Sequence, residues 1–174
     1  MTAMLRRSPA LAALALLLGL ALIPSAPASA ASADLWATVN VCDTLASPNT
    51  VGIRASMPGN GTSQRMYMRF EAQFYDRSQS KFVATGSSTR WIQVGTARVT
   101  SVQSGFSFQF APPPAGEQFV MRGRVDYRWK ARRGKPGNRR WVTVLKRKRI
   151  TRAGFIGVEG GDPPGRSAAL CVIR

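Results

Sequence analysis

Residues 118–131 read Gln-Phe-Val-Met-Arg-Gly-Arg-Val-Asp-Tyr-Arg-Trp-Lys-Ala. From Met121 to Trp129, apolar residues and one glycine alternate with arginine or aspartate. Successive side chains of a β-strand point to opposite faces of a sheet. The stretch therefore predicts a long strand with one buried face and one face rich in arginine.

The same period of two recurs along the chain. Apolar residues take alternate positions at 66–74 and 106–110, and shorter strands are expected near 35–42, 50–56, 81–85, 90–94, 97–103, 140–150 and 168–173. Clusters of Gly, Pro, Asn and Ser separate these runs. The pattern predicts an all-β fold, an antiparallel β-sandwich of roughly seven to nine strands, with a barrel as the alternative. We expect a single domain over residues 31–174.

A proline-rich corner at 111–116 leads directly into the alternating stretch 118–127. This order resembles that of immunoglobulin-like and fibronectin-type-III-like sandwiches, over roughly residues 50–150. Those families often place a tyrosine near the start of the corresponding strand, where this chain has Phe119, and antibody domains have a Cys-Trp-Cys spacing that is absent here. The resemblance therefore implies an architecture and no functional residue.

The first thirty residues are expected to direct export. Arg6 and Arg7 precede an apolar run at 10–23, and a small-residue cleavage site, Ala-Ser-Ala, ends at Ala30. This is the three-part pattern of a secretory signal peptide, and the run is shorter than the about 20 residues of a spanning helix. Cleavage is expected after Ala30 or Ala33, which predicts a secreted, extracellular protein. An excess of arginine over lysine, 20 to 5, favours a bacterial host with a GC-rich genome.

The two cysteines, Cys42 and Cys171, lie in the first and last expected strands. An even number of cysteines in an exported chain favours a disulfide, and their spacing excludes a C-x-x-C redox pair. We predict a Cys42–Cys171 bridge, with free or intermolecular thiols as the alternative.

Positive charge is concentrated in one segment. The formal net charge is +17, and residues 122–152 hold fourteen Lys or Arg against one acid, Asp126. The segment is expected to form a hairpin of strands 118–131 and 140–150. Pro136 and Gly137 at the centre of the connection suit a type II turn.

Pairing Lys135 with Asn138 in that turn sets a register for the hairpin. One face then carries the expected anion-binding residues, which are Arg122, Arg124, Arg128, Lys130, Trp141, Arg147 and Arg149. The other face carries Met121, Val125, Tyr127 and Trp129 beside Val142, Val144 and Ile150. The same register turns Lys146 and Lys148 toward the core, where unpaired charges are costly. We therefore expect a bulge, an early strand end or an edge position there.

A row of arginines on a sheet face suits phosphate, sulfate or carboxylate groups, which guanidinium groups bind through two hydrogen bonds. The expected partners are anionic polymers of the cell envelope or extracellular space, anionic membrane surfaces, or nucleic acid without sequence specificity. Trp141 could stack on a sugar or a base. A highly charged surface that only keeps the protein soluble is the alternative. The oligomeric state is not predictable.

The sequence has no histidine, so it excludes Ser-His-Asp and Cys-His catalysis, and two cysteines cannot form a four-thiolate metal site. We predict a non-catalytic protein with no cofactor and no metal, and the glycine-rich loop 159–165 is expected to be a connecting loop rather than a calcium site. Two alternatives stay open. One is a secreted hydrolase with paired carboxylates, and the other is a protein–protein interaction or inhibitor module that binds through strand edges.

Overall fold

The computed structural model describes residues 35–174, and every helix or strand assigned in that range is a β-strand. The all-β prediction is therefore confirmed. The expected signal peptide, 1–30, and both expected cleavage points lie outside the described residues. The strands are β1 (Trp36–Thr44), β2 (Ser47–Pro58), β3 (Arg65–Asp76), β4 (Lys81–Ser88), β5 (Ile92–Thr96), β6 (Ser101–Gln109), β7 (Phe119–Arg133), β8 (Arg140–Ile150) and β9 (Cys171–Ile173).

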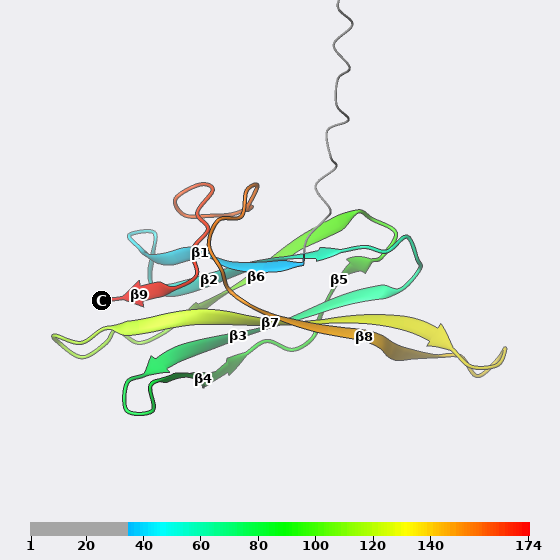
Figure 1. Cartoon of the computed structure of the whole chain (residues 1–174), viewed down its shortest axis with the longest axis horizontal. Helices are drawn as coiled ribbons and strands as arrows, with labels where there is room; N and C mark the ends of the chain where they lie inside the picture. Colours follow the sequence, from blue (N-terminus) through cyan, green and yellow to red (C-terminus); the bar gives the residue numbers. More distant parts are fainter. Residues whose placement is uncertain (1–34) are drawn as a thin grey trace, which may run out of the picture. The chain divides into compact units, whose positions relative to one another are not determined.

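The strands form two antiparallel sheets. The small sheet has the order β1-β2-β6, and the large sheet has the order β4-β3-β7-β8, with β5 on β3 and β9 on β7. Figure 1 shows β1, β2 and β6 in one layer and β3, β4, β7 and β8 in the other. The proline-rich corner connects β6 of the small sheet to β7 of the large one.

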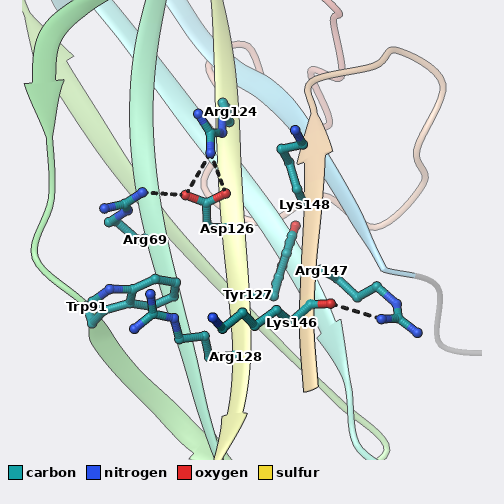
Figure 2. A pocket seen from close by; sticks show the side chains of 9 residues that line it. All are labelled: Arg69, Trp91, Arg124, Asp126, Tyr127, Arg128, Lys146, Arg147 and Lys148. Carbon is teal, nitrogen blue, oxygen red and sulfur yellow. Dashed lines mark hydrogen bonds and ion pairs between the residues drawn. The ribbon is translucent and has the colours of Figure 1, made fainter. Parts of the chain in front are cut away.

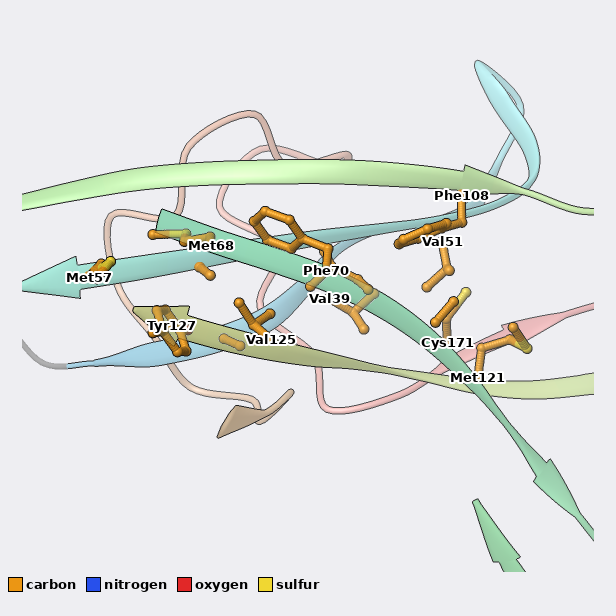
Figure 3. Close-up of a cluster of buried hydrophobic side chains, with 14 of the residues drawn as sticks. Val39, Val51, Met57, Met68, Phe70, Phe108, Met121, Val125, Tyr127 and Cys171 are labelled. Carbon is orange, nitrogen blue, oxygen red and sulfur yellow. The ribbon is translucent and has the colours of Figure 1, made fainter. Parts of the chain in front are cut away.

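Apolar side chains from both sheets meet between the layers (Figure 3). The apolar rows that the sequence predicts supply them, because every second residue of a strand faces the same side. These buried residues include Val39, Val51, Ile53 and Met57 from the small sheet and Met66, Met68, Phe70, Val125 and Tyr127 from the large sheet. The alternate residues of β3 and β7, which include most of the arginines of these strands, face outward.

One strand prediction is wrong. The two strands expected at 97–103 and 106–110 form a single strand, β6, which starts only at Ser101. Ala97 is held in a separate turn, since its carbonyl accepts hydrogen bonds from the backbone of Asn60 and Gly61 and its N–H donates to Gln64. These bonds satisfy the backbone of Ala97 outside the sheet.

The predicted hairpin of β7 and β8 is present, and so is its turn. The N–H of Asn138 donates to the carbonyl of Lys135 at 3.0 Å, and Gly137 has the positive φ, 86°, that a type II turn needs. A bulge interrupts the ladder. Trp129 pairs with Leu145 and Lys130 pairs with Thr143, so Val144 has no partner in the register. Val144, predicted to face the core, is 40% exposed, and Ile150, predicted to face the same way, lies opposite Arg124 on the outward face.

The predicted disulfide between Cys42 and Cys171 is confirmed. It joins β1 of the small sheet to β9 of the large sheet. Within residues 35–174, no helix is long and apolar enough to cross a membrane.

Candidate anion-binding site

The outward side of the large sheet carries cations on three neighbouring strands. Register places Arg65 opposite Lys130, Arg128 opposite Lys146, and Asp126 between Arg69 and Lys148. We call this surface the cationic face. Its basic residues are Arg65 and Arg69 from β3, Arg122, Arg124, Arg128 and Lys130 from β7, and Lys146 and Lys148 from β8.

The predicted face is wrong for two residues. Arg147 and Arg149 lie opposite Tyr127 and Val125, on the other side of the sheet from Arg128. Arg147 donates to the carbonyl of Lys146, and Arg149 donates to the carbonyl of Leu35. Figure 2 shows Arg147 directed away from Arg128.

The bulge explains why Arg147 and Arg149 lie on the opposite face from the one predicted. One additional residue in β8 moves every later side chain to the other side of the sheet. It brings Lys146 and Lys148 onto the cationic face and keeps them out of the core. The expectation of a bulge near these lysines is therefore confirmed.

A shallow hollow of about 600 Å³ lies at the middle of the cationic face (Figure 2). Its lining consists of Trp91, which directly precedes β5, the buried Tyr127, the acid Asp126, and the cations Arg69, Arg124, Arg128, Lys146, Arg147 and Lys148. Figure 2 shows the Lys146 side chain extending from β8 across β7 toward Arg128 and Trp91. Two cations thus converge on the same place.

Asp126, the one carboxylate that lines the hollow, is already engaged. Its side chain contacts Arg69 at 2.7 Å and Arg124 at 3.1 Å, and Arg124 also lies 3.6 Å from Glu71. Arg128, Lys146 and Lys148 form no ion pair with any carboxylate among residues 35–174. The cationic face therefore contributes to the hollow three cations without a counter-charge from the part of the chain that the structure describes, and Arg147 adds a fourth from the other side of β8.

Aromatic rings lie among these cations. The guanidinium of Arg128 is 3.8 Å from the ring centre of Trp91, and that of Arg69 is 5.3 Å from it. Trp141 lies opposite Arg132, and Arg65 covers its ring at 4.1 Å. These distances are typical of cation–π contacts.

Arg122 lies outside the hollow, farther along β7. Its Nε donates to Gln73 at 2.9 Å, and its guanidinium lies 4.0 Å from the ring centre of Phe82. Burial lowers the pKa of Arg122, but an arginine side chain remains charged in a protein. Of the seven residues predicted from the sequence, Arg124 and Arg128 line the hollow from the cationic face, and Arg147 lines it from the other side of β8.

Sequence reasoning missed Arg65, Arg69, Trp91 and the two lysines of β8. The alternation along 66–74 does place Arg65 and Arg69 on a polar face, but nothing in the sequence shows that β3 pairs with β7. The costly burial of Lys146 and Lys148 in the unbulged register was the one signal that pointed to them.

Four acidic residues contact other groups of the protein. Glu71 and Asp126 both contact Arg124, Glu159 pairs with Arg54 at 2.9 Å, and Asp162 accepts a hydrogen bond from Thr44. Among the described residues, no three His, Cys, Asp or Glu side chains are grouped so that they could hold a metal ion.

No protein-family model matches this chain, and no curated protein matches it.

Proposed function

We propose that this protein is a non-catalytic binding protein that holds an anionic polymer in the hollow of its cationic face. The observation that carries the proposal is the pairing of Arg128 with Lys146 on adjacent strands, beside Lys148, where the nearby carboxylate is already shared by two arginines.

Like charges placed opposite each other on a sheet destabilise it. A phosphate, sulfate or carboxylate group bound between Arg128 and Lys146 removes that repulsion. Arginine supplies a planar fork that suits two oxygens of such a group, and lysine supplies a mobile point charge. The hollow is open, so a polymer can lie across it with its ends outside.

We also propose that the protein acts outside the cytoplasm and has an immunoglobulin-like architecture. The disulfide supports an extracellular location, since such bonds persist in oxidising compartments. Two antiparallel sheets joined through a proline-rich corner support the architecture. In a bacterial host, the partner would be an anionic polymer of the envelope or of the surrounding medium.

Retention on immobilised heparin, eluted with a salt gradient, tests the proposal. The test variant is Arg128→Glu/Lys146→Glu/Lys148→Glu. The matched control is Arg77→Glu/Arg98→Glu/Arg152→Glu, which changes the net charge equally at three exposed positions away from the hollow.

We expect the test variant to elute at much lower salt than the control, because the hollow concentrates the charges that contact the polymer. Equal elution of the two variants would contradict a localised site. It would leave only a general attraction between a basic protein and an anionic matrix.

A further inference from the structure

Cations cover the aromatic rings of the cationic face. The partners are Arg128 and Arg69 on Trp91, Arg65 on Trp141, Lys130 on Tyr67 and Arg122 on Phe82, with distances between 3.8 and 5.3 Å. All five cation–π contacts found among residues 35–174 therefore involve cations of this one face.

A ring that stacks on a base or sugar must offer a free face to it. Around Trp91, the closest guanidinium, that of Arg128, lies at van der Waals distance from the ring. A base could take that place only by displacing the cation that the proposed function requires.

The ring instead limits the motion of the guanidinium. The guanidinium of Arg128 lies over the face of the indole, and the ring does not accept its N–H groups as a carboxylate would. Trp91 thus holds Arg128 beside Lys146 with its donors available to an oxyanion. Arg128 is half-buried, whereas Lys146 is exposed. The arginine is therefore held in place, and the lysine opposite it is free to move toward a bound group.

We propose that the hollow binds its polymer through tetrahedral oxyanions. The ligand is a linear polymer that bears phosphate or sulfate esters, and the bases or sugars of this polymer do not stack on the aromatic rings of the protein. Trp91 is a positioning residue for Arg128. This inference rests on the proposed function and specifies its ligand.

Three probes test the ligand class with the unmodified protein. They are a thymidine oligonucleotide, an abasic phosphodiester of equal length, and a heparin fragment, each titrated at the same ionic strength. The two phosphodiesters should bind with dissociation constants within about twofold of each other, because base stacking, worth about 1–3 kcal/mol per base where it occurs, makes no contribution.

A preference of tenfold or more for the thymidine oligonucleotide would overturn the inference while leaving the proposed function intact. Binding of heparin but of neither phosphodiester would restrict the class to sulfate esters and would overturn the phosphate part of it. If none of the three probes binds, or if Arg128→Glu/Lys146→Glu/Lys148→Glu binds all of them as well as the unmodified protein does, the proposed function itself fails.

Variants of Trp91 test its positioning role. Trp91→Leu keeps an apolar side chain but removes the aromatic ring, so we expect both phosphodiesters to bind about two- to fivefold more weakly, the range that an exposed cation–π contact provides. Trp91→Phe keeps a ring and should restore most of the loss. If Trp91→Leu weakens the thymidine oligonucleotide alone, the ring stacks on bases and the assigned role is wrong.

Discussion

Tyr127 places a single polar atom inside the core of the sandwich. Its side chain is fully buried, and its hydroxyl donates a hydrogen bond to the carbonyl of Trp36 at 2.6 Å. The bond links β7 of the large sheet to β1 of the small sheet. Burial raises the pKa of the phenol above its ordinary value of 10.0, and the nearby charge of Arg149 only partly offsets this.

The Tyr127→Phe variant should lower the free energy of unfolding by about 1–2 kcal/mol, because it leaves a buried carbonyl without its donor. The sign of the pH dependence follows from the raised pKa. Below about pH 10 the tyrosine is protonated in both states, whereas above it ionisation favours the unfolded chain.

Urea unfolding of both proteins from neutral to alkaline pH checks this prediction. The difference in stability between them should shrink as the pH rises above the pKa of an exposed tyrosine. A difference that stays constant across this range would show that the hydroxyl titrates normally.

Gly123 explains why a glycine interrupts the apolar row of β7. A Cβ at this position would lie 2.6 Å from Cδ1 of Ile53 and 2.8 Å from Cγ2 of Thr151. The side chain of Ile53 from the small sheet therefore occupies the space that a side chain at this position of β7 would need.

We expect Gly123→Ala to destabilise the protein by about 1–3 kcal/mol through overpacking. Adding Ile53→Val, which removes the nearest methyl group, should recover part of that loss in thermal unfolding. A double variant that is no more stable than Gly123→Ala alone would show that the crowding is not at Ile53.

Among the elements, β8 shows where prediction from the sequence succeeds and where it stops. The hairpin, its turn and the buried face of β7 follow from local patterns, since alternation and a Pro-Gly pair need no knowledge of distant strands. The choice between Arg147 and Lys146 as outward residues depends on whether Val144 is paired. A bulge changes the pairing of Val144 without changing the composition of the strand. The cost of burying Lys146 and Lys148 was therefore the one indication of the bulge in the sequence.

The pairing of β3 with β7 could not be predicted from the sequence either. It brings Arg69 to Asp126 and Trp91 to Arg128, and these contacts join segments far apart in the chain. The two sheets and the disulfide could be predicted, whereas the hollow could not, because it depends on strand order.

A substitution in β8 should have opposite effects on stability and binding. Lys146→Glu replaces a like-charge pair with Arg128 by an opposite-charge pair, which should stabilise the free protein by about 0.2–1 kcal/mol at low salt. The same change should weaken polyanion binding, since it removes one cation from the hollow.

Arg147→Glu is the matched control for stability, because it changes the same charge one residue away and faces Tyr127 instead of a cation. Thermal unfolding of both variants measures the effect on stability, and heparin elution of Lys146→Glu against the unmodified protein measures the effect on binding. A gain in stability from Arg147→Glu equal to that from Lys146→Glu would attribute the effect to net charge and not to the pair.

At the scale of the whole molecule, rigid links between the sheets hold the cationic face in place. The disulfide and the bond from Tyr127 to Trp36 both join the small sheet to the large one. The segment after β8 crosses to β1, where Ala168 and Val39 exchange backbone hydrogen bonds, before it returns as β9. These links hold β3, β7 and β8 in fixed positions. The cationic face therefore loses little conformational entropy when it binds a ligand.

The central claim is that Arg128, Lys146 and Lys148 contact the anionic groups of a bound polymer. The most direct measurement is the dependence of the dissociation constant for polyphosphate on salt concentration. Each phosphate neutralised on a single strand contributes about 0.7 to the slope of log affinity against log salt.

The variant Arg128→Gln/Lys146→Gln/Lys148→Gln should therefore lose about 2 from this slope. The control Arg77→Gln/Arg98→Gln/Arg152→Gln, with the same change in net charge, should keep the slope of the unmodified protein. A test variant that retains the full slope, or a control that loses as much, would contradict the claim.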